Sequence, residues 1–297
     1  MARRQRRPSP ATVFFALLSL ALGVALYLKT RPRPPAPGPS RTAAAPTPAP
    51  APRRSPAPTR AAVRAPSPAA KAPATGEPPR LAILIDDLGN ELAPARRLAS
   101  WREPVSGAVL PGLAYSAASA RALADGGKQV LLHLPMEPHG FPKVRPGPGV
   151  ILRAQSDVEI VRTLEEDLAT VPGAAGVNNH MGSAATADPR VMRAVTRVLS
   201  RRGLFFVDSR TTDATVAERT AEEESVPSAH RRVFLDDVAT EAAVRAQLDE
   251  AVAHARNEGG CIAIGHPYPA TLAVLERELP RMAEEGVRLV KVGELVR

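Results

Sequence analysis

The sequence has a single cysteine, Cys261, and only 3% of its residues are aromatic. One cysteine excludes an internal disulfide and every zinc site built from paired cysteines. A His-Glu-x-x-His segment is also absent, which excludes the helix-borne zinc motif of many metalloproteases. A folded domain in this chain must therefore depend on its hydrophobic core, and the 218 residues of 80–297 are enough to form one.

Net positive charge is absent outside the N-terminal part, although the whole chain carries a formal charge of +9. Residues 1–79 hold 13 of the 39 lysines and arginines but only one of the 30 acidic residues, Glu77. The remaining 26 basic and 29 acidic residues give residues 80–297 a balance of −3. Such a domain lacks the main electrostatic support for binding nucleic acid, so we expect no nucleic-acid partner.

The N-terminal residues have the pattern of a membrane anchor. Residues 1–11 contain four arginines, and residues 12–28 are 17 apolar or small residues. As a helix, that run is about 26 Å long, at the short end for a bilayer span. The arginines predict that residues 1–11 stay in the cytoplasm and that the rest is exported. Because no Ala-x-Ala site follows closely, an uncleaved signal anchor is favoured over a cleaved signal peptide.

Residues 29–79 are predicted to be a disordered linker. Of the 32 prolines in the chain, 18 lie in residues 1–79, mixed mainly with alanine, arginine, serine and threonine. This composition cannot form a packed core and is typical of an extended tether with polyproline character. We therefore expect a single-pass protein of a bacterial inner membrane with its C-terminal domain in the periplasm. Secretion after signal cleavage is the alternative.

Short apolar runs alternate with helical patterns throughout residues 80–297. The helix signals include a Ser156–Glu159 capping box and a helix that starts at Asp188–Pro189 and ends at Gly203. Continuous apolar strands between helices predict a parallel sheet covered on both faces. We expect an α/β fold, a distorted (β/α) barrel of 7–8 mostly parallel strands, with an open doubly wound sheet as the alternative. The predicted strands are residues 81–85, 105–110, 129–134, 174–179, 204–209, 232–236, 261–266 and 287–292.

Polar side chains gather where six of these strands end. In a parallel barrel all such ends open on one face, and carboxylates with neutral imidazoles there suit a divalent cation such as zinc. In the Asp86–Asp87 pair, one carboxylate can bind the ion while the other acts as a base. A lone aspartate after a strand is more often a helix N-cap, which is our interpretation of Asp236 and Asp237. The segments are IDDLG (85–89), LHLPMEP (132–138), GVNNHMGS (176–183), FFVDSRT (205–211), VFLDD (233–237) and AIGHPYP (263–269).

In this order the six segments resemble the divergent polysaccharide deacetylase family. That family is related to metal-dependent deacetylases that remove N-acetyl groups from chitin-like and peptidoglycan sugars, on a distorted (β/α) barrel. The resemblance implies Asp86 as the catalytic base, Asp87 as a metal ligand and His266 as the general acid. The domain lacks the His-x-x-x-His and Arg-Pro-Pro segments of those relatives. We therefore expect His133 and His180, on separate strands, to complete the metal site.

These expectations combine into one functional hypothesis for residues 80–297. The resemblance implies a metal-dependent hydrolase, with zinc as the expected metal, that removes acetyl groups from an envelope polysaccharide, and the N-terminal pattern implies that it is tethered to the membrane. The substrate would be peptidoglycan-like or another acetylated glycan, and the N-terminal helix would bind the inner membrane. The alternative is a non-catalytic module that binds glycan or scaffolds the envelope on the same barrel. The residues that we expect to contact the sugar are Glu137, Asn179, Asp208 and Arg210.

Overall fold

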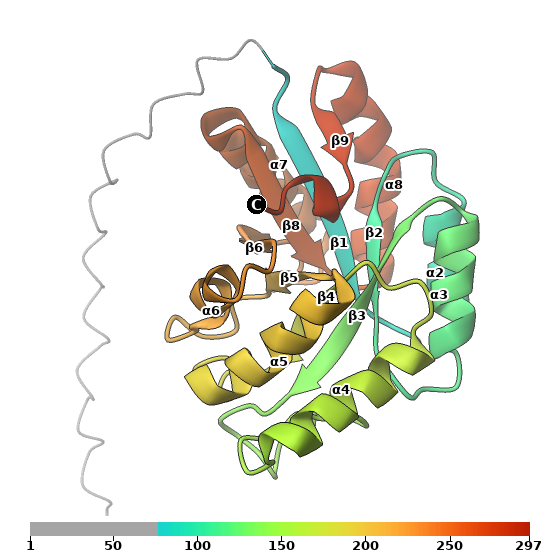
Figure 1. Cartoon of the computed structure of the whole chain (residues 1–297). Helices are drawn as coiled ribbons and strands as arrows, with labels where there is room; N and C mark the ends of the chain where they lie inside the picture. Colours follow the sequence, from blue (N-terminus) through green and yellow to red (C-terminus); the bar gives the residue numbers. More distant parts are fainter. Residues whose placement is uncertain (1–76) are drawn as a thin grey trace, which may run out of the picture. The chain divides into compact units, whose positions relative to one another are not determined.

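The computed structural model describes residues 77–297 (Figure 1). The predicted cytoplasmic N-terminus, the predicted anchor and residues 29–76 of the predicted linker lie outside the described residues. Within residues 77–297, no helix is both long enough and apolar enough to cross a membrane. The end of the predicted linker leads directly into the first strand, and the carbonyl of Pro79 accepts a hydrogen bond from the amide of Arg288.

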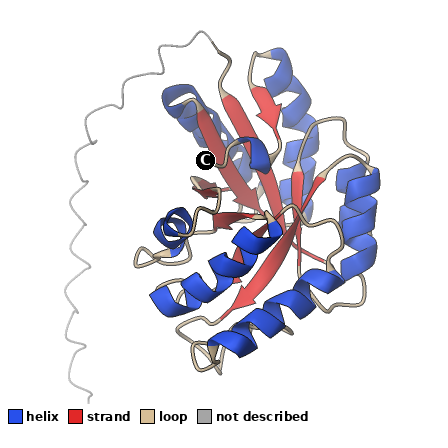
Figure 2. Cartoon of the chain, viewed as in Figure 1, coloured by secondary structure: helices blue, strands red, loops and turns tan. Residues whose placement is uncertain are grey.

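Parallel strands form a single curled sheet in this part of the chain (Figure 2). They are β1 Arg80–Leu88, β2 Ser106–Val109, β3 Gln129–Met136, β4 Gly176–Met181, β5 Phe205–Asp208, β6 Ser228–His230, β7 Val233–Phe234, β8 Gly260–Gly265 and β9 Arg288–Val290. The order across the sheet is β6-β5-β4-β3-β2-β1-β8-β7, and β9 pairs with the first residues of β1. Each predicted apolar run therefore forms a strand of a parallel sheet.

The two strands at opposite ends of the sheet order, β6 and β7, follow each other directly in the chain. β6 pairs with β5 and β7 pairs with β8, yet only two residues, Arg231 and Arg232, separate β6 from β7. The amide of Arg231 donates to the carbonyl of Asp208, and the amide of Arg232 donates to the carbonyl of Ile262. The sheet is thus a curled, partial barrel whose last segment is broken after His230. This agrees with the predicted distorted barrel rather than with the open doubly wound alternative.

Helices cover the outside of the sheet (Figures 1 and 2). Their bounds are α2 Ala93–Ala99, α3 Ser116–Asp125, α4 Asp157–Thr170, α5 Pro189–Arg202, α6 Ala217–Glu223, α7 Glu241–Glu258 and α8 Pro269–Glu284, followed by a 3₁₀ turn at Val292–Glu294. The predicted capping box is present, with the Ser156 and Glu159 side chains each accepting a hydrogen bond from the other residue's backbone amide. Asp188 caps α5, and Gly203 ends it with a φ of 65°. Local signals therefore fix where these two helices begin and end.

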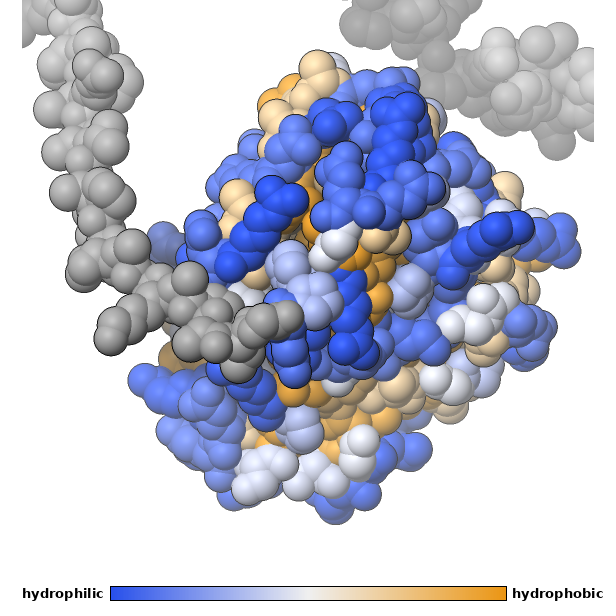
Figure 3. Space-filling model, turned by 90° about the horizontal axis from the view of Figure 1, so that it is seen from above, coloured by the Kyte–Doolittle hydropathy of each residue, from blue (hydrophilic) through white to orange (hydrophobic). Residues whose placement is uncertain are grey.

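The sheet separates two apolar layers. Successive side chains of a strand point to opposite faces, so Ile83 and Ile85 of β1 pack outward under the helices while Leu84 points inward. Leu131 of β3 and Ile264 of β8 join Leu84 inside the curl. Both faces of the central strands are thus buried, which explains their continuous apolar sequence. Figure 3 views the side on which β1 begins, where hydrophilic residues cover most of the face and hydrophobic surface lies in recesses between them.

Candidate metal centre

Because side chains alternate between the two faces of a strand, several reactive side chains point into one end of the curled sheet. Asp86 follows Leu84 by two positions on β1 and therefore continues the inward-facing row. His133 on β3 and His266 just beyond β8 follow inward-facing apolar residues in the same way. The inner core therefore ends in carboxylates and imidazoles at the carboxyl ends of the strands, where the sequence placed the site.

A bulge explains how two adjacent carboxylates reach this one place. In a regular strand Asp86 and Asp87 would point to opposite faces. The pairing of β1 with β2 instead shifts register between Ile85 and Leu88, and Asp87 has a φ of 55°, in the left-handed region. Bulges of this kind re-aim a side chain and are frequent beside active sites. As a result, oxygens of Asp86 and Asp87 lie 3.6 Å and 3.2 Å from the same atom, Nε2 of His133.

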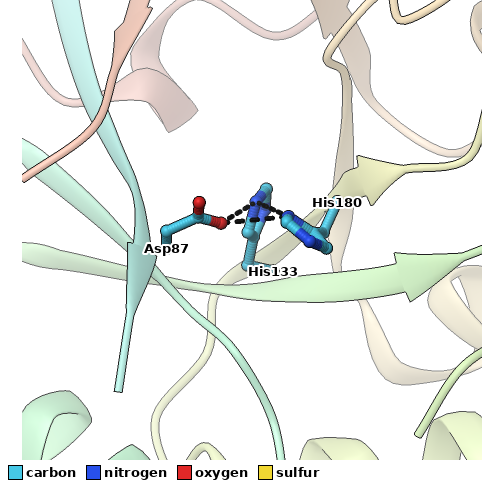
Figure 4. A group of neighbouring side chains, drawn as sticks. All are labelled: Asp87, His133 and His180. Atoms are coloured by element: carbon cyan, nitrogen blue, oxygen red, sulfur yellow. Dashed lines mark hydrogen bonds and ion pairs between the residues drawn. The ribbon is translucent and has the colours of Figure 1, made fainter. Parts of the chain in front are cut away.

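Asp87, His133 and His180 come together as the sequence predicted (Figure 4). Oδ1 of Asp87 lies 3.2 Å from Nε2 of His133 and 3.0 Å from Nδ1 of His180, and the two nitrogens are 3.1 Å apart. Ligand atoms about 2.1 Å from a tetrahedral zinc ion would lie roughly 3.4 Å from one another. The three side chains thus have nearly the spacing that one shared cation requires.

Two further observations show that these residues fit a metal ion. Oδ1 of Asp87 is a buried oxygen that accepts no hydrogen bond from the residues described. Nδ1 of His133 lies 3.0 Å from Oδ1 of Asn178, which makes it the proton donor and leaves Nε2 with a lone pair facing Asp87. Burial favours a higher pKa for the Asp87 carboxyl, but the charge that the imidazoles of His133 and His180 carry when protonated outweighs it and holds that pKa well below its usual range. Asp87 is therefore an ionised acceptor, as a metal ligand must be.

Asp86 lies behind this triad in a different environment. The side-chain amide of Asn178 donates to both of its oxygens, at 2.9 and 3.1 Å, and also contacts the hydroxyl of Ser209. Burial raises the pKa of the Asp86 carboxyl, although His133, His266 and Asn178 oppose the shift. A carboxylate with a raised pKa, held in one orientation, has the properties of a general base.

His266 is oriented by an aspartate that we had interpreted as a helix cap. Asp236 accepts hydrogen bonds from Nδ1 of His266 at 2.9 Å, from its backbone amide at 2.6 Å and from the Thr271 hydroxyl at 2.8 Å. The helix-cap interpretation of Asp236 is therefore wrong, because Thr240 caps α7. Burial favours a lower pKa for His266, but Asp236 and the other nearby carboxylates raise it. Nε2 of His266 lies 3.7 Å from Oδ2 of Asp87, beside the triad.

A cavity of about 450 Å³ opens over these residues. Of the side chains expected to contact sugar, Arg210 and Asn179 line it. The amide group of Asn179 is already engaged, since Oδ1 accepts from the amide of Ser209 and Nδ2 donates to the carbonyl of Met181. Asn179 thus holds the ends of β4 and β5 together.

Glu137 and Asp208 are not among the residues that line that cavity, so their contact with sugar stays a prediction. The Glu137 carboxylate accepts hydrogen bonds from the backbone amide and the guanidinium of Arg153, and fastens the following loop to β3. Asp208 is fully buried and accepts from the amide of Arg210 and the hydroxyl of Thr215. Both carboxylates thus have hydrogen-bond partners within the domain.

The sequence placed Asn178 and Ser209 at the strand ends but assigned no role to them, and it did not single out Arg231 or Phe234. Asn178 is the neighbour of His133 in the pairing of β3 with β4, a relation that depends on strand register. Asp236 carried a usable signal, because an apolar run followed by two aspartates occurs in VFLDD as it does in IDDLG. This repetition favoured the interpretation of Asp236 as a site residue over its interpretation as a helix N-cap.

Comparison with known proteins identifies one family, two sequence relatives and a solved structure of similar fold. A family model described as divergent polysaccharide deacetylase matches residues 83–296. An uncharacterised protein of Haemophilus influenzae is 38% identical over 218 residues, which are 73% of this chain and 77% of that protein. The uncharacterised protein YibQ of Escherichia coli is 37% identical over 217 residues, 73% of this chain and 67% of that protein. The fold matches the crystal structure of an uncharacterised Agrobacterium tumefaciens protein, with a TM-score of 0.71, 24% identity and coverage of 76% and 93%.

Proposed function

The chain belongs to the divergent polysaccharide deacetylase family, and on this premise we propose that it is a metal-dependent hydrolase that removes acetyl groups from an envelope polysaccharide. The observation that carries the proposal is a three-residue ligand set with a buried carboxylate and an oriented imidazole beside it. Asp86 lies 3.6 Å from His133 on one side of the triad, and His266 lies 3.7 Å from Asp87. A base and an acid beside one cation are the groups that acyl hydrolysis needs.

Asp87, His133 and His180 would hold the metal. Two imidazole nitrogens and one carboxylate oxygen form the donor set of many catalytic zinc sites, so zinc is the metal that we propose. When bound, zinc supplies a Lewis acid that polarises the acyl carbonyl and makes water more acidic. The hydrogen bond from His133 to Asn178 fixes which ring nitrogen faces the ion.

Asp86 acts as the base of the reaction. Its carboxylate takes a proton from the attacking water, and the two hydrogen bonds from Asn178 hold it in the orientation for that transfer. Burial raises the pKa of Asp86, which makes the carboxylate a stronger base than an exposed one. Asn178 is therefore a positioning residue that contacts both the base and a metal ligand.

His266 acts as the acid. Asp236 holds its Nδ1–H, so Nε2 faces the cavity and delivers a proton to the leaving amine or alkoxide. The carboxylates around it raise its pKa against the effect of burial, which keeps the imidazolium populated closer to neutral pH. The pair thus resembles other His–Asp arrangements in which the carboxylate orients an imidazole and stabilises its charged form.

The proposed location follows from the sequence N-terminal to the domain. Residues 12–28 would anchor the protein in the inner membrane, and residues 29–79 would give the domain reach into the periplasm. An envelope polysaccharide would then be within range of the cavity.

An acetate-release assay tests the proposed function. The zinc-loaded protein is expected to release acetate from acetylated chitooligosaccharides or peptidoglycan fragments, and a chelator should abolish the release. Asp86→Asn should lower kcat by about 100-fold or more, because the proton acceptor is lost. The same variant should still bind zinc, since Asp86 is not in the ligand set. Glycan binding with no acetate release from any substrate by zinc-loaded protein would replace the enzyme with the non-catalytic alternative.

A further inference from the structure

The cavity over the metal centre borders a second cavity beside the segment that joins β6 to β7. The first has a volume of about 450 Å³ and the second about 470 Å³. Arg231, Phe234 and Asp237 line both. The second is also lined by Val238 and Gln247, so it leads away from the triad toward α7. A ligand longer than one sugar unit could therefore place its acyl group at the metal and extend past the Arg231 side chain into the second cavity.

Arg231 is held in place by backbone groups. Its Nε donates to the carbonyl of Ser209 at 2.7 Å, and its Nη2 donates to the carbonyl of Arg210 at 3.0 Å. The guanidinium carbon also lies 4.9 Å from the centre of the Phe234 ring. These contacts fix the plane of the guanidinium without using a carboxylate, and no protein acceptor among residues 77–297 contacts its Nη1.

The charge of Arg231 is not paired within the described domain. Among residues 77–297, no carboxylate oxygen lies within 4.0 Å of its nitrogens, and the nearby Arg210 has only a 3.8 Å contact with Glu218. The adjacent Arg232, by contrast, forms a 2.6 Å ion pair with Glu258. Burial lowers the pKa of Arg231 and the carboxylates of Asp208 and Asp86 oppose that effect, but a guanidinium stays charged at neutral pH.

A half-buried, oriented guanidinium without a counter-ion is a favourable site for an anion. Its planar donors match the two oxygens of a carboxylate or of a phosphate. Arg210 places a second guanidinium in the lining of the same cavity. Asp237 also lines it and its carboxylate attracts the Arg231 charge, but Asp237 is exposed and forms no ion pair with Arg231 within 4.0 Å.

We propose that the substrate of this site is an anionic glycan, whose carboxylate or phosphate group is bound by Arg231, with Arg210, next to the acylated sugar. The inference rests on the proposed function, because it places the acyl group at the metal. Two aromatic rings beside His266 suit the sugar itself. Phe234 and Tyr268 have ring centres 5.3 and 5.4 Å from that of His266, and Tyr268 is 44% exposed.

The test compares acetate release from four probes by the zinc-loaded full chain. The probes are chitotetraose, a tetrasaccharide that alternates N-acetylglucosamine with glucuronic acid, the methyl ester of that tetrasaccharide, and chitotetraose phosphorylated at carbon 6. We expect kcat/KM to be at least 10-fold higher for the carboxylate than for its methyl ester, or for the phosphorylated than for the plain chitotetraose. Which pair differs identifies the anionic group.

Two variants connect the preference to Arg231. Arg231→Gln is expected to reduce the ratio between anionic and neutral probes toward one. Arg232→Gln removes the same charge from the neighbouring position, outside the cavity over the metal, and should keep the ratio. Equal turnover of anionic and neutral probes would overturn the inference while leaving the proposed function intact. An equal loss of preference in both variants would also overturn it, because long-range attraction would then explain the preference.

A binding measurement separates failure of this inference from failure of the proposed function. The Asp86→Asn variant, loaded with zinc, is titrated with the carboxylate tetrasaccharide and with its methyl ester. Tighter binding of the carboxylate that disappears on adding Arg231→Gln supports the anion site even if the protein releases no acetate from any probe. Equal affinity for the two ligands contradicts it.

Discussion

At the scale of single residues, two buried aspartates of this domain differ in their partners. Asp86 accepts two hydrogen bonds from Asn178. Asp167 of α4 is 6% exposed, and its Oδ2 accepts no hydrogen bond from any described residue. Burial raises the pKa of the Asp167 carboxyl to about 8, with a smaller contribution from Glu166. The first aspartate belongs to the proposed reaction, whereas the second affects the stability of the fold.

The raised pKa of Asp167 predicts a loss of stability as pH increases. The folded protein keeps the Asp167 proton up to a pH of about 8, whereas the unfolded chain loses it near pH 3.8. The folded state therefore binds more protons than the unfolded chain between these values. The contribution of Asp167 to the free energy of unfolding is complete below pH 3.8 and decreases steadily as the pH rises to about 8. Asp167→Asn should raise the free energy of unfolding by roughly 1–3 kcal/mol at pH 8 and by little at pH 4.

Urea unfolding of both proteins from pH 4 to pH 9 measures this difference. Asp213→Asn, at an exposed loop position, is the matched control and should stay within about 0.5 kcal/mol of the parent. A stability difference for Asp167→Asn that does not change with pH would show that the folded-state carboxyl is not protonated at neutral pH.

At the scale of elements, the spacing of β4 and β5 depends on a glycine. A Cβ atom on Gly176, the first residue of β4, would lie 2.4 Å from the ring of Phe205. Phe205 begins β5 and is its neighbour in the pairing of the two strands. Because β4 carries Asn178, Asn179 and His180, this contact helps to set the position of the metal centre.

Gly176→Ala should therefore destabilise the protein by about 1–3 kcal/mol through overpacking. Phe205→Leu should relieve the clash, so the double variant should lose less than the sum of the two single changes. Chemical denaturation of the four proteins gives this coupling. Additive effects would mean that the ring moves aside without cost and does not determine the spacing.

The elements themselves were largely predictable from sequence, and the reasons are physical. Strands buried on both faces must be apolar throughout, so each long strand could be recognised in the sequence as a continuous apolar run. β6 was missed because its residues, Ser-Ala-His, have neither an apolar run nor alternation. The roles of Asn178 and Arg231 could not be predicted for a different reason. Their partners are set by strand register and by the break after His230, and neither is written in local sequence.

At the scale of the whole molecule, the metal centre joins elements that are far apart in the chain. Its three candidate ligands come from β1, β3 and β4, so an ion bound there would connect the early and middle parts of the domain. Such an ion binds the folded state and not the unfolded chain. Its affinity is then added to the free energy of unfolding.

Zinc is accordingly expected to raise the melting temperature of the protein. At a zinc concentration 100-fold above Kd the gain is about 2.7 kcal/mol, which corresponds to roughly 5–10 °C for a domain of this size. Asp87→Ala should remove the shift. His254→Ala is the matched control, because His254 lies on α7 between Glu250 and Glu258 and is the most evident competing surface site. Calorimetric scans that lose the shift in His254→Ala but keep it in Asp87→Ala would place the zinc elsewhere.

The bulge at the end of β1 has a consequence for how an ion would enter. Ile85 before it and Leu88 after it are both buried and paired with neighbouring strands, so the backbone of Asp87 is tethered on both sides. The ligands are thus preorganised by the sheet and need no coupled folding, unlike the small zinc domains that are unstructured without metal. Capture of the ion should therefore proceed in a single fast step whose rate depends on encounter and loss of hydration water.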